Sequence, residues 1–252
     1  MPATFRQQVA LSLFSCLLHT VACAGEVNVA VAANFTAPMK IIAQYFERDT
    51  GHKATLAFGA TGQLYAKIKN GAPFAILLAG DEKVPAKIEA EGLGVTGMRF
   101  TYATGKLVLW SKKTGLVDDK GSILNSGKFS KIAIANPKLA PYGAAAIEVL
   151  EQMGLTAAIS PKIVESSNIA QAFQFVSSEN ATLGIVALSQ VFEGGKFKEG
   201  SGWVIPPSMY KPIKQDAVLL NAGKGNAAAE ALMTYLRSEE AKRVIRSFGY
   251  AL

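Results

Sequence analysis

The chain of 252 residues is half apolar and carries a formal net charge of +7 at neutral pH. Its length allows one large domain or two lobes with a substantial core. The sequence has only two cysteines and two histidines, which argues against an enzyme built on a Ser-His-Asp, Cys-His or zinc site.

The first 24 residues are typical of a secretory signal peptide. Arg6 precedes an apolar stretch over residues 9–18, and the segment ends in Ala22-Cys23-Ala24, a small-x-small cleavage pattern. The apolar stretch is too short to span a bilayer. An N-terminal membrane anchor and a buried first helix are the alternatives. We therefore expect cleavage after Ala24 and export to the periplasm.

Removal of this leader leaves 228 residues without cysteine, because Cys16 and Cys23 both lie in it. The mature chain then has no disulfide, thiol nucleophile or thiolate metal site. Lipidation of Cys23 is the less favoured alternative, since Thr20 fits the usual aliphatic position poorly. His52 is expected to be a solvated loop residue at a helix exit.

The mature net charge is +6 once Arg6 has been removed. The lysines are scattered singly, with Lys112-Lys113 the only adjacent pair. Proteins that bind nucleic acid usually show a clustered basic stripe, so we expect no nucleic-acid partner. A diffuse positive field of this kind attracts small anions.

Short apolar strands alternate with amphipathic helices along the mature chain, as in a mainly parallel sheet covered by helices. In the first helix, for example, Met39, Ile42 and Phe46 recur at helical spacing. The expected strands cover residues 26–32, 53–58, 74–78, 106–110, 131–135, 162–165, 182–187 and 215–220. The expected helices cover residues 37–49, 64–70, 81–91, 143–153, 169–177, 226–236 and 238–247.

Two α/β lobes fit this order of elements better than one. The pattern restarts after residues 100–102, and we place the crossings between lobes near 101–104 and 211–215. Lobe 1 is then expected over residues 25–103 together with 214–252, and lobe 2 over 104–213. The two C-terminal helices would return to pack on lobe 1.

Four turns each follow a strand and open a helix, at residues 32–36, 58–63, 137–143 and 166–169. They are rich in small, hydroxyl and amide residues, contain no acid, and contain one base, Lys138. Helix N-termini present unpaired N–H groups that favour anions. Ordinary helix caps and turns have the same composition, which is the alternative at each junction.

A pocket that contains only donors also selects among anions. Hydrogen phosphate must donate its own proton, whereas a full dianion only accepts hydrogen bonds. Such a pocket favours molybdate, tungstate or sulfate over hydrogen phosphate.

The sequence resembles the periplasmic molybdate-binding proteins of ABC importers over essentially the whole mature chain. The resemblance rests on VAVAANFTAPMKIIAQYFERDTG, FGATGQLYAKIKNGAPFAILLAGD, IAIANPKLAPYGAAAIEVLEQMG, LGIVALSQV and YLRSEEAKRVIRSFGY. It implies an α/β, two-lobe periplasmic-binding-protein fold of type II-like architecture with a two-segment hinge. It also implies a monomer without cofactor or enzymatic activity that delivers molybdate or tungstate to a membrane permease, with sulfate as the alternative ligand.

The resemblance also implies the ligand-binding residues. Asn34 occupies the position of the polar ligand in the first turn, and Thr61 that of the hydroxyl ligand in the second. Tyr142 and Ile169 match positions that contribute backbone N–H groups, and Ala33 and Gly62 are weaker backbone candidates. Molybdenum would be present only within the oxyanion, with no direct bond to protein atoms.

The chain departs from the family pattern at two positions. Many members have a tyrosine ligand where this chain has Ala187, and we expect the Asn34 amide to replace its hydroxyl. Ala75 stands where the family usually has aspartate. The missing tyrosine is the best support for a competing hypothesis, a binding protein of the same fold for another solute. An enzyme acting on an anionic substrate is the other alternative, although the turns contain no paired acids.

Overall fold

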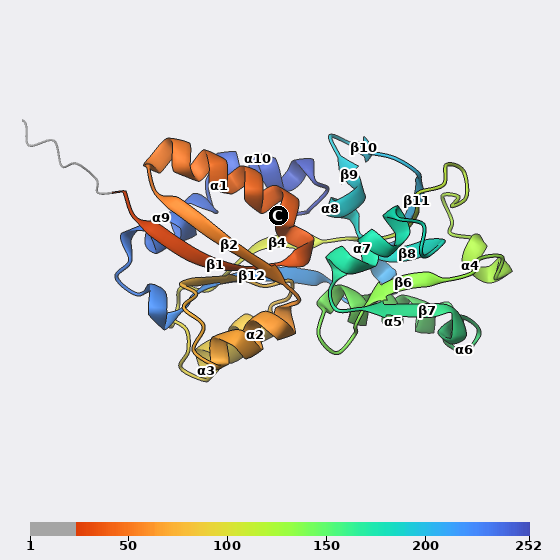
Figure 1. The fold of residues 1–252 in the computed structure, drawn as a ribbon, viewed down its shortest axis with the longest axis horizontal. Helices are drawn as coiled ribbons and strands as arrows, with labels where there is room; N and C mark the ends of the chain where they lie inside the picture. The colour runs from red at the N-terminus through yellow and green to blue at the C-terminus, as the bar shows by residue number, and fades with distance from the viewer. Residues whose placement is uncertain (1–23) are drawn as a thin grey trace, which may run out of the picture.

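The computed structural model describes residues 24–252, which form two α/β lobes side by side along the long axis of the molecule (Figure 1). The expected signal peptide, apart from Ala24, lies outside the described residues, and so do Cys16, His19 and Cys23. Each lobe contains a five-stranded sheet with helices packed on it, so the expected α/β fold class is confirmed.

The sheet of the first lobe combines strands from both ends of the mature chain. Its strands are β1 (Glu26–Ala32), β2 (Lys53–Gly59), β3 (Ile76–Leu78), β4 (Phe100–Gly105) and β12 (Ile213–Leu219). Its helices are α1 (Thr36–Thr50), α2 (Thr61–Lys69), α3 (Lys83–Ala90), α9 (Ala227–Tyr235) and α10 (Glu239–Ser247). The strand order is β2-β1-β3-β12-β4, with β1 parallel to β2 and β3, and β12 antiparallel to β3 and β4.

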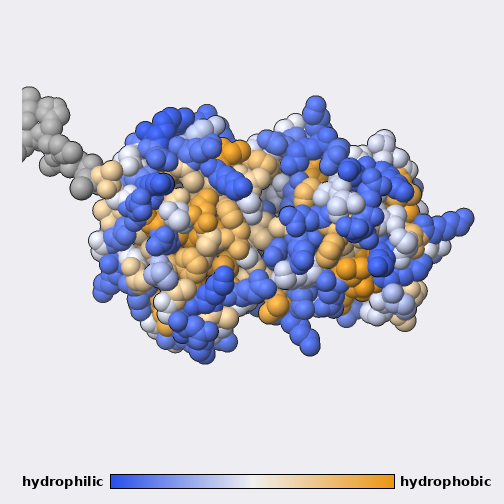
Figure 2. All heavy atoms as spheres, viewed as in Figure 1, coloured by the Kyte–Doolittle hydropathy of each residue, from blue (hydrophilic) through white to orange (hydrophobic). Residues whose placement is uncertain are grey.

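Alternation along β1 separates the two faces of this sheet. Val27, Val29 and Val31 pack in one core with α1, α9 and α10. Ala30 packs on the opposite face with Leu64 of α2 and with α3. The C-terminal helices therefore return to the first lobe. Figure 2 shows apolar residues gathered on its surface between α1 and α2, where β2 forms the sheet edge.

The second lobe is built from the middle of the chain. Its sheet contains β5 (Leu107–Ser111), β6 (Ile132–Ala135), β7 (Ile163–Ser166), β8 (Leu183–Ala187) and β11 (Ser201–Val204) in the order β11-β5-β8-β6-β7. Its helices are α4 (Ile123–Ser126), α5 (Pro141–Gln152), α6 (Thr156–Ile159), α7 (Ile169–Ser177) and α8 (Leu188–Val191), and a small hairpin joins β9 (Phe192–Glu193) to β10 (Lys196–Phe197). β6 is parallel to β7 and β8, whereas β5 is antiparallel to β8 and β11.

The chain crosses between the sheets twice, from β4 into β5 around Lys106 and from β11 into β12. Near the second crossing, the pairing of β12 with β4 shifts register between Gln215 and Asp216. A bulge of this kind re-aims side chains beside functional sites.

Several elements differ from the sequence prediction. β4 and β11 have no predicted counterpart, because neither contains a clear run of apolar residues. The prediction for His52 is wrong: it is 9% exposed, and its Nδ1 accepts a hydrogen bond from the Gly25 N–H at 2.9 Å. Within residues 24–252, no helix combines the length and apolar composition that a membrane crossing requires.

Candidate functional site

The four predicted turns, two from each lobe, meet at one small cavity between the lobes. The cavity is small: the space open to the centre of a water-sized sphere is about 10 Å³. It lies where β1, β2, β6 and β7 end and the following helices begin, as expected for ligand sites of open α/β sheets. Its lining residues are Ala32, Ala33, Asn34, Gly59, Ala60, Thr61, Ala140, Pro141, Tyr142 and Ile169.

In the first turn, the chain leaves β1 through the short 3-10 helix η1 (Ala33–Phe35). Asn34 is 3% exposed, and its Nδ2 donates to Gln215 Oε1 at 2.8 Å and to Tyr250 Oη at 3.0 Å. We expected this amide to replace a tyrosine hydroxyl at the ligand. Because both hydrogens of the amide already have partners, the group that Asn34 can offer to the cavity is its backbone N–H at the start of η1.

In the second turn, Thr61 is the first residue of α2 and is 1% exposed. Its Oγ1 accepts a hydrogen bond from the Gly80 N–H at 2.9 Å. A hydroxyl that accepts one hydrogen bond still has its own proton to donate. Gly80 follows β3, and a Cβ there would lie 3.1 Å from Asn34 Oδ1 and 3.2 Å from Thr61 Oγ1. Glycine at this position therefore lets the first two turns approach.

Gly62 lies outside the cavity lining, unlike the other predicted residues. Its N–H donates across the lobes to the Leu139 carbonyl at 3.0 Å. In this closed arrangement, Gly62 joins the lobes and its N–H is not available to a ligand.

In the third turn, Pro141 begins α5 and Tyr142 follows in its first turn. Proline is favoured at this position because the first helical N–H has no partner in the helix. An added Cβ on Gly143 would overlap the Ala135 carbonyl, so glycine lets α5 start directly against the end of β6. The backbone N–H groups of the first turn of α5 are therefore held close to the cavity.

In the fourth turn, Ile169 is the first residue of α7 and is 3% exposed. Asn168 caps this helix, because its Oδ1 accepts a hydrogen bond from the Gln171 N–H at 3.1 Å. Gln190 Nε2 donates to the Ile169 carbonyl at 3.0 Å and ties the turn to α8.

The cavity lining is electrically neutral. Tyr142 is its one titratable residue, and burial raises the pKa of its phenol well above the ordinary value. The lining carries no formal charge, and the groups that it can donate to an anion are N–H and O–H groups. Helix N-termini and a hydroxyl form a suitable donor set for such a ligand.

The two positions that depart from the family pattern, Ala187 and Ala75, lie in different parts of the structure. Ala187 is fully buried at the end of β8, and its N–H donates to Gln190 Oε1 at 3.0 Å. Ala75 lies in the core of the first lobe, away from the cavity lining, and packs against Gly223. The change at Ala75 therefore leaves the cavity itself unaltered.

Five residues near the cavity were missed by the sequence analysis: Gly80, Tyr102, Ser189, Gln215 and Tyr250. Gly80 lies two residues after the end of a buried strand, which is a usable local signal. The other four make long-range hydrogen bonds that no local pattern reveals.

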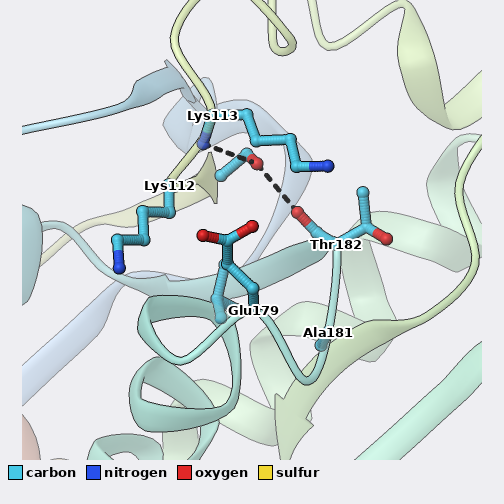
Figure 3. Close-up of a pocket in the computed structure, with 7 residues that line it drawn as sticks. Lys112, Lys113, Glu179, Ala181 and Thr182 are labelled. Atoms are coloured by element: carbon cyan, nitrogen blue, oxygen red, sulfur yellow. Dashed lines mark hydrogen bonds between the residues drawn. The ribbon is translucent and has the colours of Figure 1, made fainter.

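Another pocket, in the second lobe, has a different kind of lining. Figure 3 shows a pocket at the end of β5, where Ser111 Oγ donates to the Thr182 carbonyl at 2.8 Å and accepts from the Lys113 N–H at 3.2 Å. This pocket lies at the other end of the strands from the four turns. β5 begins and β8 ends at the lobe junction, whereas Ser111 and Thr182 lie at the opposite ends of these strands. Its charged side chains, Lys112, Lys113 and Glu179, form no neutral donor set.

The fold and the cavity between its lobes are those of an extracellular solute-binding protein, and residues 27–251 match the family described as bacterial extracellular solute-binding protein. The chain is 56% identical to the molybdate-binding protein ModA of Azotobacter vinelandii over 97% of each chain. It is 51% identical to ModA of Rhodobacter capsulatus, covering 91% of this chain and 89% of that relative. The chain belongs to the ModA family of molybdate-binding proteins.

Solved structures agree with this assignment. The periplasmic molybdate-binding protein of Azotobacter vinelandii superposes with a TM-score of 0.86 at 40% identity, covering 90% of this chain and 99% of that one. The sulfate-binding protein SubI of Mycobacterium tuberculosis gives a TM-score of 0.70 at 12% identity, covering 90% and 86%. The second likeness is one of fold alone.

Proposed function

We propose that this protein is the solute-binding component of an ABC importer, and that it captures molybdate between its lobes and delivers it to a membrane permease. The observation that carries the proposal is the neutral cavity at which four helix-opening turns converge. Its relatives named for molybdate binding, from Azotobacter vinelandii and Rhodobacter capsulatus, support the choice of ligand. Tungstate, which has the same shape and charge, is proposed as a second ligand.

In this proposal, the anion accepts hydrogen bonds from the Thr61 hydroxyl and from backbone N–H groups. The backbone donors are Asn34, Thr61, Tyr142 and Ile169, with Ala33 as an additional one. Hydrogen bonds to an ionised group contribute about 1.5–3 kcal/mol each. Five or six of them, less the costs of desolvation and ordering, are sufficient for about 8–12 kcal/mol, or micromolar to nanomolar binding.

The absence of an acceptor carboxylate from the cavity lining supports selection against hydrogen phosphate. A protonated anion would find no carboxylate to accept its own O–H, and an O–H left unpaired costs about 1–3 kcal/mol. No step of this function requires the protein to transform its ligand. We therefore propose that it is not an enzyme.

The same proposal covers the rest of the molecule. Residues 25–103 with 214–252 and residues 104–213 act as two lobes that open and close about the two crossings. Residues 1–24 are a signal peptide that directs a monomeric mature protein to the periplasm, which fits its membership of an extracellular protein family.

Calorimetric titration of the mature protein with molybdate, tungstate, sulfate and phosphate tests the proposal. We expect tight binding of molybdate and tungstate, weaker binding of sulfate and no binding of phosphate. If the protein binds neither molybdate nor tungstate, the proposed ligand is wrong. If it binds sulfate more tightly than both, the protein is assigned to sulfate. Turnover of a phosphoester or sulfoester that survives repurification would contradict the absence of enzymatic activity.

A further inference from the structure

A cluster of uncharged polar side chains is buried next to the cavity. Asn34, Tyr102, Gln215 and Tyr250 come from the first lobe, and Tyr142 and Ser189 come from the second. We call these six residues the interlobe network. All six residues are at most 5% exposed, and each makes at least one hydrogen bond within the cluster.

Gln215 is the centre of the interlobe network and is fully buried. Its Oε1 accepts hydrogen bonds from Asn34 Nδ2 at 2.8 Å and from the Tyr102 hydroxyl at 3.0 Å. Its Nε2 donates across the lobes to Tyr142 Oη at 2.8 Å. The Tyr102 hydroxyl has a single proton, which it shares between Gln215 Oε1 and the Ala79 carbonyl at 2.9 Å.

Gln215 itself does not line the cavity, but two of its partners do. Asn34 lies in the first turn and Tyr142 in the third, one in each lobe. Gln215 therefore links the two halves of the site from behind. Its place beside the bulge in β12 puts it two residues from the start of the strand that follows the second crossing.

One further contact across the lobes, from Ser189, and one contact within the first lobe, from Tyr250, accompany this link. Ser189 Oγ donates to the Asn34 carbonyl at 2.9 Å, and the Tyr250 hydroxyl donates to the same carbonyl at 2.9 Å. Both bonds hold the peptide group of the first turn. None of these groups is charged, so the interlobe network adds no electrostatic repulsion to a bound anion.

We propose that Gln215 is a positioning residue that couples lobe closure to anion binding. Its hydrogen bond to Tyr142 exists only while the lobes are closed, and it holds the first turn of α5 against the first turn of the other lobe. Removing the bond leaves buried polar partners unsatisfied in the closed form. The closed, ligand-bound state then opens sooner. The inference rests on the proposed function, since molybdate is the probe.

Stopped-flow dissociation of molybdate tests the coupling in a double-mutant cycle. Gln215→Met and Tyr142→Phe each remove one side of the same hydrogen bond, and we expect each to accelerate dissociation about threefold to tenfold, the worth of one hydrogen bond. The double variant should be no faster than the faster single variant, because both changes break one interaction. Dissociation that is unchanged in Gln215→Met, or factors that simply multiply, would overturn the proposal.

Tyr210→Phe is the matched control. The Tyr210 hydroxyl is also buried near the lobe junction, but it accepts its hydrogen bond from the Leu107 N–H at 3.1 Å, outside the interlobe network. We expect this variant to keep the wild-type dissociation rate, and any small effect to multiply with that of Gln215→Met.

Gln215→Glu separates positioning from a general loss of stability. Burial raises the pKa of such a carboxyl group, and below that pKa its O–H donates to Tyr142 while its C=O accepts from Asn34 and Tyr102, as the glutamine does. Above it, the carboxylate repels the anion. The facing titratable groups are Tyr102, Tyr142 and Tyr250, whose pKa values burial raises, so they stay neutral in this range. Two acids lie nearby: Asp216 is paired with Arg99, and Asp81, whose pKa burial raises, is kept in both Gln215 variants.

We therefore expect the molybdate affinity of Gln215→Glu to rise as the pH falls from 8 to 5.5, while that of Gln215→Met stays low throughout. Equal pH dependence in the two variants would show a merely structural role and overturn the proposal.

A ligand-free measurement distinguishes failure of this inference from failure of the proposed function. The mature chain has no cysteine, so Glu47→Cys in α1 and Glu151→Cys in α5 provide one exposed spin-label site in each lobe. If the wild-type protein binds none of the anions, the proposed function is wrong. The interlobe network is then judged by the label distance alone: a longer mean distance in Gln215→Met supports it, and an identical distribution overturns it.

Discussion

Thr61 has two roles at the second turn, because its hydroxyl accepts the Gly80 N–H while its proton remains available to the cavity. Replacing Thr61 with valine keeps the shape and removes the hydroxyl. We expect molybdate affinity to fall about tenfold to a hundredfold, which corresponds to about 1–3 kcal/mol for a lost donor to a charged ligand. Calorimetry measures this loss.

The control for this change is Thr234→Val. Thr234 is exposed on α9, and its hydroxyl donates to the Glu230 carbonyl within the same helix. We expect Thr234→Val to bind molybdate with the wild-type affinity. An unchanged affinity in Thr61→Val would remove Thr61 from the proposed ligand set.

The pH dependence of binding also follows from single residues. Tyr142 is the titratable group in the cavity lining, and burial raises its pKa well above the ordinary value, so the neutral phenol persists as the pH rises. The pKa of Tyr250 behind it is raised to about 12 by burial. Molybdate affinity, followed by titration at constant ionic strength, should stay constant between pH 6 and 9. A clear inflection in this range would mean that another protein group titrates at the ligand.

Among the secondary-structure elements, the N-termini of helices position the backbone N–H groups that are proposed to bind the anion. Asn168 caps α7, whose first residue is the proposed donor Ile169. Asn226 caps α9 in the same way, by accepting from the Ala229 N–H at 3.0 Å, but α9 is not part of the cavity lining. The two caps therefore form a matched pair.

Alanine at either cap is expected to lower the free energy of unfolding by about 1 kcal/mol, measured by urea denaturation. Only Asn168→Ala should also weaken molybdate binding, since the first turn of α7 is then less ordered. Equal affinities in the two variants would show that the Ile169 N–H contributes little to binding.

Closure is a property of the whole molecule, and Gly105 at the first crossing leaves room for it. A Cβ on Gly105 would overlap Tyr142 Oη and lie 2.6 Å from Gln215 Nε2. Gly105→Ala should therefore hold the lobes apart, weaken molybdate binding and increase the radius of gyration of the ligand-saturated protein in small-angle scattering. The separate cores of the two lobes should stay folded.

Gly25→Ala is a suitable comparison, because its added Cβ would make only an ordinary contact of 3.4 Å with Ala228. If ligand-saturated Gly105→Ala has the same radius of gyration as this control and the wild-type protein, the prediction is wrong. Lobe closure then does not require a residue without a side chain at position 105.

The sequence alone was sufficient for most of the fold, because helices and strands follow local rules. The spacing of Met39, Ile42 and Phe46 predicts the buried face of α1, and all three side chains are fully buried. The apolar run after Phe74 predicts β3, although the strand is shorter than expected. The four turns were also visible in the sequence, since small and hydroxyl residues mark the strand ends and helix starts where they occur.

The tertiary structure alone decided how these turns are connected. Gln215 contacts Asn34 across 181 residues of sequence and Tyr142 across 73, and Tyr250 contacts Asn34 across 216. In the tertiary structure, the Asn34 amide is hydrogen-bonded to other protein side chains, and the Gly62 N–H donates to a carbonyl of the other lobe. Periodicity and helix caps are properties of neighbouring residues, so a sequence displays them directly. Hydrogen bonds between distant segments depend on where the fold brings their side chains, and that is determined only when both lobes are packed and closed.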